Sequence, residues 1–256
     1  MSKAKTLILR APGTNCDAET AFAFEQAGAE ASLVHVNQLI RGEQRLADYQ
    51  IMVIPGGFTY GDDIAAGKVL ANELRLKLGE DIPRFIKDGG LILGICNGFQ
   101  VLVKAGILPR PANGSPPLLT LMTNDSGKFE CRWVHLRVNK KSPCVFTRGI
   151  DSLYLPVAHA EGKVVADPQA LPELDVVLYY TDEDGNSNAG YPYNPNGSVE
   201  NIAGIGDTSG RIFALMPHPE RYIRGTQHPQ WTKQGAKQYG DGFQIFLNAV
   251  KWAESL

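Results

Sequence analysis

The chain has 256 residues, of which 43% are hydrophobic and 20% are charged. These are the proportions of an ordinary globular protein, and they exclude an intrinsically disordered chain. The formal net charge is -2, and there is no cluster of lysines and arginines of the kind that follows a phosphate backbone, so we expect no nucleic-acid partner. No stretch approaches the roughly 18 apolar residues of a membrane-spanning helix, so we expect no membrane partner.

The cysteines indicate a reducing compartment. There are four irregularly spaced cysteines: Cys16, Cys96, Cys131 and Cys144. No two of them form the Cys-x-x-Cys pair used for zinc or redox chemistry, so we expect no metal. The first apolar run, residues 7–9, is too short for the core of a signal peptide. We therefore expect the protein in the cytoplasm.

The first 110 residues alternate between short apolar runs and helical patterns. Strands are expected at 7–9, 32–36, 51–54 and 91–95, and helices at 18–28 and from the end of the last strand to residue 105. This alternation is typical of a parallel sheet with crossover helices, and therefore of an α/β fold. Residues 51–54 and 91–93 are apolar at every position, as in strands covered on both faces. Ligands bind such sheets at the carboxyl ends of strands, which places the expected site after residues 54 and 95.

The pattern changes between residues 111 and 210. Short strand-like segments at 133–138, 153–158 and 176–181 are separated by clusters of Asp, Asn, Gly and Pro, which favours antiparallel hairpins. An apolar strand at 211–216 and a helix from residue 242 then restore the α/β pattern. We therefore predict one domain over 1–256 with a β-rich insertion at about 111–210.

Residues 91–103 contain a candidate nucleophile. They run from a buried strand through Gly94-x-Cys96-x-Gly98 into a helix, which is a cysteine version of the nucleophile elbow. The glycines allow neighbouring backbone to come close, and a helix start favours the thiolate form of Cys96. A free cysteine is often only a small buried hydrophobic residue. The flanking glycines favour the catalytic interpretation for Cys96, whereas the other three cysteines are interpreted as non-catalytic.

Attack on an amide creates an oxyanion, which needs preorganised N–H donors. Asn97, the residue after the nucleophile, supplies one backbone N–H. The glycine-rich loop at 55–62 directly follows the strand at 51–54 and could supply the second, although such a sequence also fits a plain turn.

His218 is the best candidate for the general base among the five histidines. It lies between Pro217 and Pro219, and a proline biases the residue before it towards extended backbone. Residues two apart in an extended segment point the same way, which would place Glu220 beside His218. A carboxylate that orients a histidine completes a Cys, His, Glu triad. The alternative is two surface residues in a proline-rich loop.

These motifs resemble those of the class I glutamine amidotransferases, whose triad is Cys, His, Glu in that chain order. Further segments are similar to the family of glutaminase subunits of phosphoribosylformylglycinamidine (FGAM) synthases, and together they span nearly the whole chain: residues 13–17, 55–62, 124–132, 158–162 and 191–198. The resemblance implies a flavodoxin-like, open and mostly parallel sheet. It also implies hydrolysis of glutamine through a thioester on Cys96, with proton transfer by His218.

The same resemblance implies the remaining site residues. Gly57 and Asn97 correspond to oxyanion donors, and Gln100 corresponds to a substrate contact. The residues expected near the glutamine pocket are Phe58, His159 and Glu161. The role of residues 222–239 is not indicated, although they could form a surface for a partner.

No nucleotide site is expected in this chain. Residues 61–68 have one residue too many for a phosphate-binding loop, and residues 204–210 miss the dinucleotide fingerprint. ATP and Mg²⁺ are therefore expected on a partner synthetase subunit that receives the ammonia, with a small bridging subunit as a further partner. Two alternatives remain: a stand-alone γ-glutamyl cysteine hydrolase, and a non-catalytic binding module of the same fold.

Overall fold

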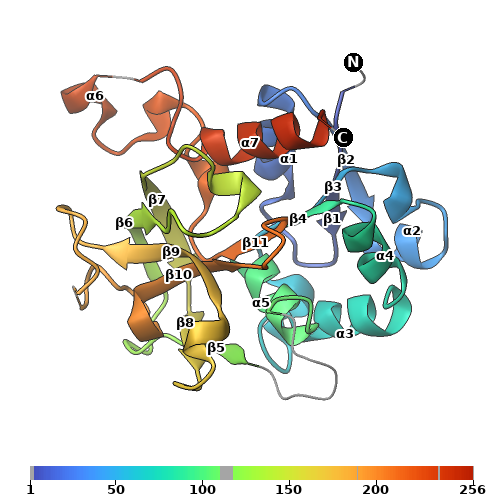
Figure 1. The fold of residues 1–256 in the computed structure, drawn as a ribbon, viewed down its shortest axis with the longest axis horizontal. Coiled ribbons are helices and arrows are strands. Elements are labelled where there is room, and N and C mark those ends of the chain that lie inside the picture. Colours follow the sequence, from blue (N-terminus) through green and yellow to red (C-terminus); the bar gives the residue numbers. More distant parts are fainter. Residues whose placement is uncertain (1–2, 110–117, 189, 236, 256) are drawn as a thin grey trace.

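A computed structural model describes residues 3–109, 118–188, 190–235 and 237–255. A twisted sheet runs through the molecule, and helices cover it on both sides (Figure 1). The first residues of the predicted insertion, 111–117, lie outside the described part of the chain. Within that part, no helix is both long enough and apolar enough to cross a membrane.

One half of the sheet is parallel. Its strands follow the order β2-β1-β3-β4-β11, and every neighbouring pair in this half is parallel. They are β1 (Lys5–Arg10), β2 (Glu30–His35), β3 (Ile51–Ile54), β4 (Leu91–Ile95) and β11 (Ile212–Leu215). Every residue of β3, β4 and β11 is buried, because helices cover both faces of the sheet there. The predicted α/β fold with a mostly parallel core is confirmed.

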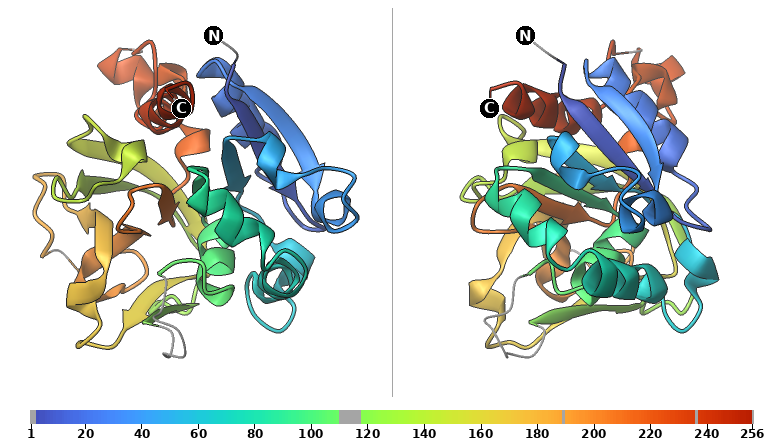
Figure 2. Two further views of the ribbon diagram at one scale, coloured as in Figure 1. Left: turned by 45° about the vertical axis from the view of Figure 1, so that its right-hand side comes forward. Right: turned by 90° about the vertical axis from the view of Figure 1, so that its right-hand side faces the viewer.

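Helices form the outer layers around these strands. Figures 1 and 2 show α1 and α7 together on one face and α3 and α5 on the other, and each of these two pairs is in contact. The helices are α1 (Asp17–Gln26), α2 (Val36–Ile40), α3 (Lys68–Lys77), α4 (Asp81–Lys87), α5 (Asn97–Lys104), α6 (Trp231–Gln234) and α7 (Phe243–Ala253). The amphipathic tail helix expected from residue 242 is thus α7, with its apolar face buried.

The β-rich insertion continues the same sheet. From β11 onward the order is β10-β9-β6-β7, and all these pairs are antiparallel. The strands are β10 (Ile202–Gly206), β9 (Asp175–Thr181), β6 (Glu130–Val138) and β7 (Ser152–His159), while β5 (Leu119–Thr123) and β8 (Glu161–Ala166) form a separate two-stranded sheet. The predicted strands at 133–138, 153–158 and 176–181 correspond to β6, β7 and β9.

Several elements differ from the sequence prediction by a few residues or were not predicted, and two of these differences have a clear physical reason. The strand expected at 32–36 occupies Glu30–His35, because His35 caps the short helix α2. His35 Nδ1 accepts from the Asn37 N–H at 3.1 Å, and the His35 N–H donates to Gln38 Oε1 at 2.9 Å. In addition, α3 and α4 fill the connection between β3 and β4, for which no helix was predicted. They provide the crossover that two parallel neighbouring strands require.

The segment at 222–239 lies over the antiparallel half of the sheet. Its ends meet in a bridge between Arg224 and Tyr239, and the short helix α6 lies between them. The His228 ring packs 5.7 Å from the Trp133 ring and 5.5 Å from the Tyr154 ring. This segment is therefore attached to β6 and β7 through an aromatic cluster.

Candidate active site

Cys96 occupies the sharp turn between β4 and α5. Its backbone has φ of 51° and ψ of -102°, a conformation that non-glycine residues rarely adopt. The Cys96 N–H donates to the Leu215 carbonyl of the neighbouring strand β11 at 2.8 Å, which fixes the turn to the sheet. The thiol is 5% exposed and lies 3.7 Å from the Ala158 carbonyl oxygen. The nucleophile elbow predicted from the sequence is present.

The two glycines around Cys96 are required by close packing. A Cβ on Gly98 would overlap the backbone carbonyl of Ile54 at the end of β3, and a Cβ on Gly94 would lie 2.6 Å from Leu102 Cδ1 and 2.9 Å from the Gly98 carbonyl. No side chain fits at either position without moving backbone. Glycine therefore lets α5 pack directly on the ends of β3 and β4.

The loop after β3 places Gly57 against the loop after β1. Gly57 has φ of 152° and forms a bridge with Thr14. The Phe58 N–H donates to the Gly13 carbonyl at 2.9 Å, so the Phe58 amide is occupied and only its 45% exposed ring can meet a ligand. In the described part of the chain, neither the Gly57 N–H nor the Asn97 N–H has an acceptor. Both are available as the oxyanion donors that the resemblance implies.

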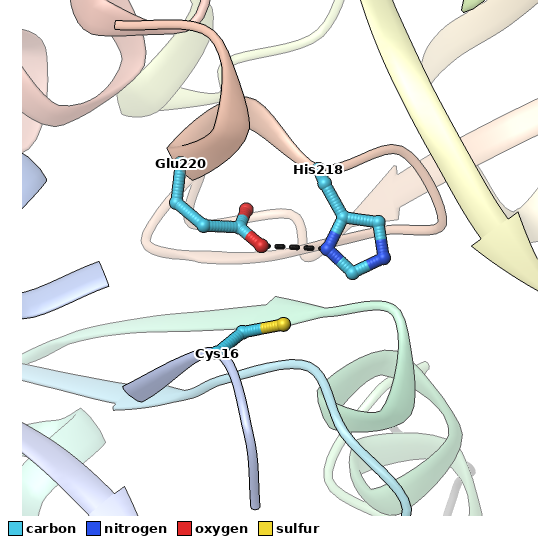
Figure 3. Close-up of side chains that lie close together, drawn as sticks. All are labelled: Cys16, His218 and Glu220. Atoms are coloured by element: carbon cyan, nitrogen blue, oxygen red, sulfur yellow. Dashed lines mark hydrogen bonds and ion pairs between the residues drawn. The ribbon is translucent and has the colours of Figure 1, made fainter. Parts of the chain in front are cut away.

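His218 and Glu220 form a buried pair. The distance between His218 Nδ1 and Glu220 Oε1 is 2.6 Å, and both side chains are at most 1% exposed (Figure 3). The expected pairing of His218 and Glu220 is thus present. The extended backbone expected over residues 218–220 is present only at His218. His218 is extended, whereas Pro219–Arg221 form a 3₁₀ turn. Proline at the first position of that turn has the required φ, and the turn brings the Glu220 carboxylate back to the ring.

The surroundings of His218 favour its protonated form. Burial alone would lower the pKa of His218, but the negative charges of the Glu220 carboxylate and of the Cys96 thiolate outweigh burial and hold this pKa well above its usual value. His218 Nε2 is buried and makes no hydrogen bond to any described residue. With Nδ1 held by Glu220, Nε2 is the ring nitrogen that can exchange protons with a substrate.

Cys16, for which the sequence predicts no catalytic role, places a second thiol beside this pair (Figure 3). Ligand atoms of Cys16, His218 and Glu220 lie within 4.8 Å of one another. A divalent cation is disfavoured there, because Arg221 Nη2 lies 3.1 Å from Cys16 Sγ and already supplies a positive charge. A Cβ on Gly56 would lie 2.8 Å from His218 Cε1 and 3.2 Å from Cys16 Sγ, so the Gly56 backbone packs directly against both side chains.

No sequence pattern indicated that Cys16 and Arg221 would meet at the triad. The sequence position of Cys16 was the available signal that it could lie near the site. The loop that carries Cys16 follows β1, and the carboxyl end of β1 lies at the same edge of the sheet as the carboxyl ends of β3 and β4. Of the other cysteines, Cys144 is buried and Cys131 is exposed.

Asn97 and Gln100 connect the elbow to the loops around it. Asn97 Oδ1 accepts from the Thr59 hydroxyl at 2.7 Å, and Asn97 Nδ2 donates to Gln100 Oε1 at 2.9 Å. The Gln100 amide nitrogen donates to the Glu161 carbonyl, so both ends of this amide are used within the chain. The Glu161 carboxylate pairs with Lys104 Nζ at 2.6 Å. Gln100 and Glu161, which are expected at the glutamine pocket, therefore hold α5 to the start of β8.

His159 lies at the end of β7, directly after the residue whose carbonyl approaches the Cys96 thiol. It is 2% exposed, and its Nδ1 lies 3.1 Å from Asn124 Oδ1. Burial, together with the nearby positive charge of His218, lowers the pKa of His159 to about 3. At neutral pH the His159 imidazole is therefore in its neutral form, close to the residue that contacts the Cys96 thiol.

The site combines a thiol on a strained backbone turn, two free N–H donors and a buried imidazole–carboxylate pair at one edge of a parallel sheet. These are the groups that acyl transfer from an amide to a cysteine requires. The sequence matches the family described as the CobB/CobQ-like glutamine amidotransferase domain over residues 3–253. The chain belongs to this family of glutamine amidotransferases.

Individual relatives narrow the family further. The chain is 62% identical to phosphoribosylformylglycinamidine synthase subunit PurQ of Dehalococcoides mccartyi, over 100% of both chains. It is 44% identical to the PurQ subunit of Archaeoglobus fulgidus, over 98% of each chain. Among solved structures, PurLQS from Thermotoga maritima contains a chain with 32% identity and a TM-score of 0.75, with 98% of both chains covered.

Proposed function

We propose that this chain is the glutaminase subunit of an FGAM synthase in the cytoplasm. The observation that carries the proposal is the buried His218–Glu220 pair beside the strained Cys96 turn, at 2.6 Å between Nδ1 and Oε1. It occurs in a chain whose full-length relatives bear the name of that subunit. The reaction is the hydrolysis of glutamine to glutamate and ammonia.

In the first half of the reaction, the Cys96 thiolate attacks the side-chain amide carbon of glutamine. The carbonyl oxygen becomes an oxyanion, which the N–H groups of Gly57 and Asn97 stabilise. His218 Nε2 gives its proton to the amide nitrogen, the C–N bond breaks, and ammonia leaves. The product on the enzyme is a thioester between Cys96 and the γ-carbon of glutamate.

In the second half, His218 acts as a base. Its Nε2 takes a proton from water, and the resulting hydroxide equivalent attacks the thioester carbon. The C–S bond breaks, glutamate leaves, and Cys96 is again a thiolate beside the protonated imidazole. Glu220 stabilises the imidazolium in both halves of the cycle without changing its own protonation state.

The partner in this proposal is a synthetase subunit that binds ATP and Mg²⁺ and aminates formylglycinamide ribonucleotide. A small bridging subunit is a further proposed partner. The exposed rings of Phe58 and Phe129, whose centroids are 6.5 Å apart, supply an apolar contact next to the Gly57 loop. Ammonia that reaches bulk water is protonated, so direct docking over this edge of the sheet protects it.

The test compares Cys96→Ala with Cys131→Ala, which changes an exposed free cysteine. Each protein is assayed for glutamate release from glutamine, alone and with the synthetase subunit, ATP and formylglycinamide ribonucleotide. We expect Cys96→Ala to abolish glutamine-dependent release and amination, and Cys131→Ala to behave as wild type. Amination driven by added ammonium chloride should survive Cys96→Ala, because that step belongs to the partner.

The two alternatives predict different outcomes. A stand-alone γ-glutamyl hydrolase would act on glutamyl peptides faster than on glutamine and would not respond to the synthetase subunit. A non-catalytic module would release no glutamate under any condition, and a glutamine-analogue electrophile would not label Cys96. Either result would reject the proposed function.

A further inference from the structure

Arg221 donates to a sulfur atom although a carboxylate lies beside it. Arg221 Nη2 is 3.1 Å from Cys16 Sγ, whereas Arg221 Nε is 3.9 Å from Glu220 Oε1, which is too long for a hydrogen bond. The other carboxylate oxygen, Glu220 Oε2, is buried and has no hydrogen-bond partner among the described residues. A guanidinium normally pairs with a carboxylate, and a thiol sulfur is only a weak acceptor. The unpaired oxygen therefore indicates that Arg221 is held away from Glu220.

Cys16 is fixed firmly enough to hold Arg221. Its side chain is 1% exposed, and its N–H donates to the Gly56 carbonyl at 3.1 Å. The sulfur also lies 3.1 Å from Asn15 Oδ1. Because a guanidinium can only donate, the sulfur accepts from Arg221 and gives its own proton to Asn15 Oδ1. The thiol is thus oriented by a neighbour on each side.

The sulfur lies beside the base and its carboxylate. Cys16 Sγ, a ring nitrogen of His218 and a carboxylate oxygen of Glu220 are within 4.8 Å of one another (Figure 3). Two residues before Cys16, Thr14 forms a bridge with Gly57, whose N–H is a proposed oxyanion donor. One short segment after β1 therefore contacts both the oxyanion loop and the base.

We propose that Cys16 is a positioning residue for glutamine hydrolysis: its sulfur holds the Arg221 guanidinium away from Glu220, so that the charge of this carboxylate acts fully on His218. If the guanidinium turned towards Glu220, two cations would share the carboxylate and the imidazolium would be less stable. Cys16 acts through Arg221 and takes no part in bond making. This inference rests on the proposed function and adds two residues that the triad mechanism does not use.

The charges around His218 give the proposal a direction in pH. The titratable and charged groups that face this ring come from its own turn, the loop after β1, the elbow and the end of β7: Glu220, Arg221, Cys16, Cys96 and His159. Burial lowers the pKa of His218, whereas Glu220, Cys96 and Cys16 raise it. Loss of the Cys16 sulfur removes one of these groups and lets a positive charge approach, and both changes lower this pKa. Activity that depends on the imidazolium is then lost at lower pH.

The test variant is Cys16→Ala, which removes the sulfur and keeps the backbone N–H that donates to Gly56. Cys16→Ser supplies a hydroxyl that can accept from Arg221 in place of the sulfur. The control is Cys144→Ala, which removes an equally buried thiol beside Gly210, before the start of β11, whereas His218 follows the end of that strand. Circular dichroism verifies that each variant is folded. Glutamate release is then measured across pH with the synthetase subunit, ATP and formylglycinamide ribonucleotide.

We expect Cys16→Ala to lower kcat on the order of 10-fold with little change in the KM for glutamine, because the base is displaced and the substrate contacts are kept. The high-pH limb of the kcat/KM profile should move down by about one pH unit. Cys16→Ser should return both quantities close to wild type. Cys144→Ala should leave the profile unchanged even if it lowers the melting temperature.

A second background tests whether Cys16 acts through Arg221. In Arg221→Ala there is no guanidinium to hold, so adding Cys16→Ala should not move the high-pH limb further. A limb that shifts equally in both backgrounds, a profile unchanged in Cys16→Ala, or a Cys16→Ser as defective as Cys16→Ala would each overturn the positioning role. A wild type that releases no glutamate at any pH would reject the proposed function instead.

Discussion

Glu220 gives the two ring nitrogens of His218 different roles: Nδ1 is bound to the carboxylate, and Nε2 is available for proton transfer. A hydrogen bond of 2.6 Å holds Nδ1, while Nε2 remains free on the other edge of the ring. The carboxylate is 1% exposed, and Arg221 Nε lies 3.9 Å from it. A buried carboxylate at this distance fixes the tautomer of the imidazole and stabilises its protonated form.

Glu220→Gln keeps the size of the side chain and removes its charge. We expect kcat for glutamate release to fall by roughly 10²- to 10⁴-fold with a much smaller change in KM, because Glu220 acts on His218 and not on glutamine. The Glu220 charge raises the pKa of His218, so its removal lowers that pKa. Activity that depends on the imidazolium should therefore be lost at lower pH than in wild type.

The measurement is the pH dependence of kcat and kcat/KM for both proteins. Glu254→Gln, which changes an exposed carboxylate near the end of α7, is the matched control and should leave both profiles unchanged. A Glu220→Gln enzyme with the wild-type kcat would show that the pair is structural.

At the scale of elements, the turn between β4 and α5 depends on how closely α5 approaches β3. The Gly98 Cα lies so near the Ile54 carbonyl that a Cβ would overlap it. Both residues are buried, and the surrounding backbone belongs to the centre of the sheet. A larger residue at this position must displace either the helix or the strand.

Gly98→Ala should therefore destabilise the protein by about 2–4 kcal/mol. The free energy of unfolding is obtained from urea titrations followed by circular dichroism. Gly190→Ala is the control, because a Cβ on Gly190 has no atom within 4 Å and its φ is not positive. Equal stability of the two variants would mean that α5 can move away from β3 at little cost.

The sequence could predict β3 and β4 because strands covered on both faces are apolar at every position. The elbow was also predictable, since Gly94, Cys96 and Gly98 lie within five consecutive residues and each is required by the local turn. Other features depend on residues that only folding brings together. The contact between Cys16 and Arg221 is one of these. The 3₁₀ turn that positions Glu220 is local, but its three residues are too few to give a periodic pattern.

For the whole molecule, the β-rich insertion shares one sheet with the α/β core. β11 pairs with β4 on one side and with β10 on the other, so the hydrogen-bond ladder is continuous. We propose on this ground that the chain folds as one domain. Scanning calorimetry should then show a single transition whose calorimetric and van't Hoff enthalpies agree. Two separated transitions would instead assign the insertion to an independent domain.

The position of β11 also sets the order in which this enzyme becomes competent. β11 carries His218 directly after its end, and it pairs with β4 at residues about 120 positions earlier in the chain. Closing so long a loop is slow, and it requires the intervening strands to be made first. A nascent chain on the ribosome therefore contains the nucleophile, Cys96, well before the base, His218, has been synthesised. β11 is the last strand in the chain, so the base is added to the sheet edge only after the other strands have been synthesised.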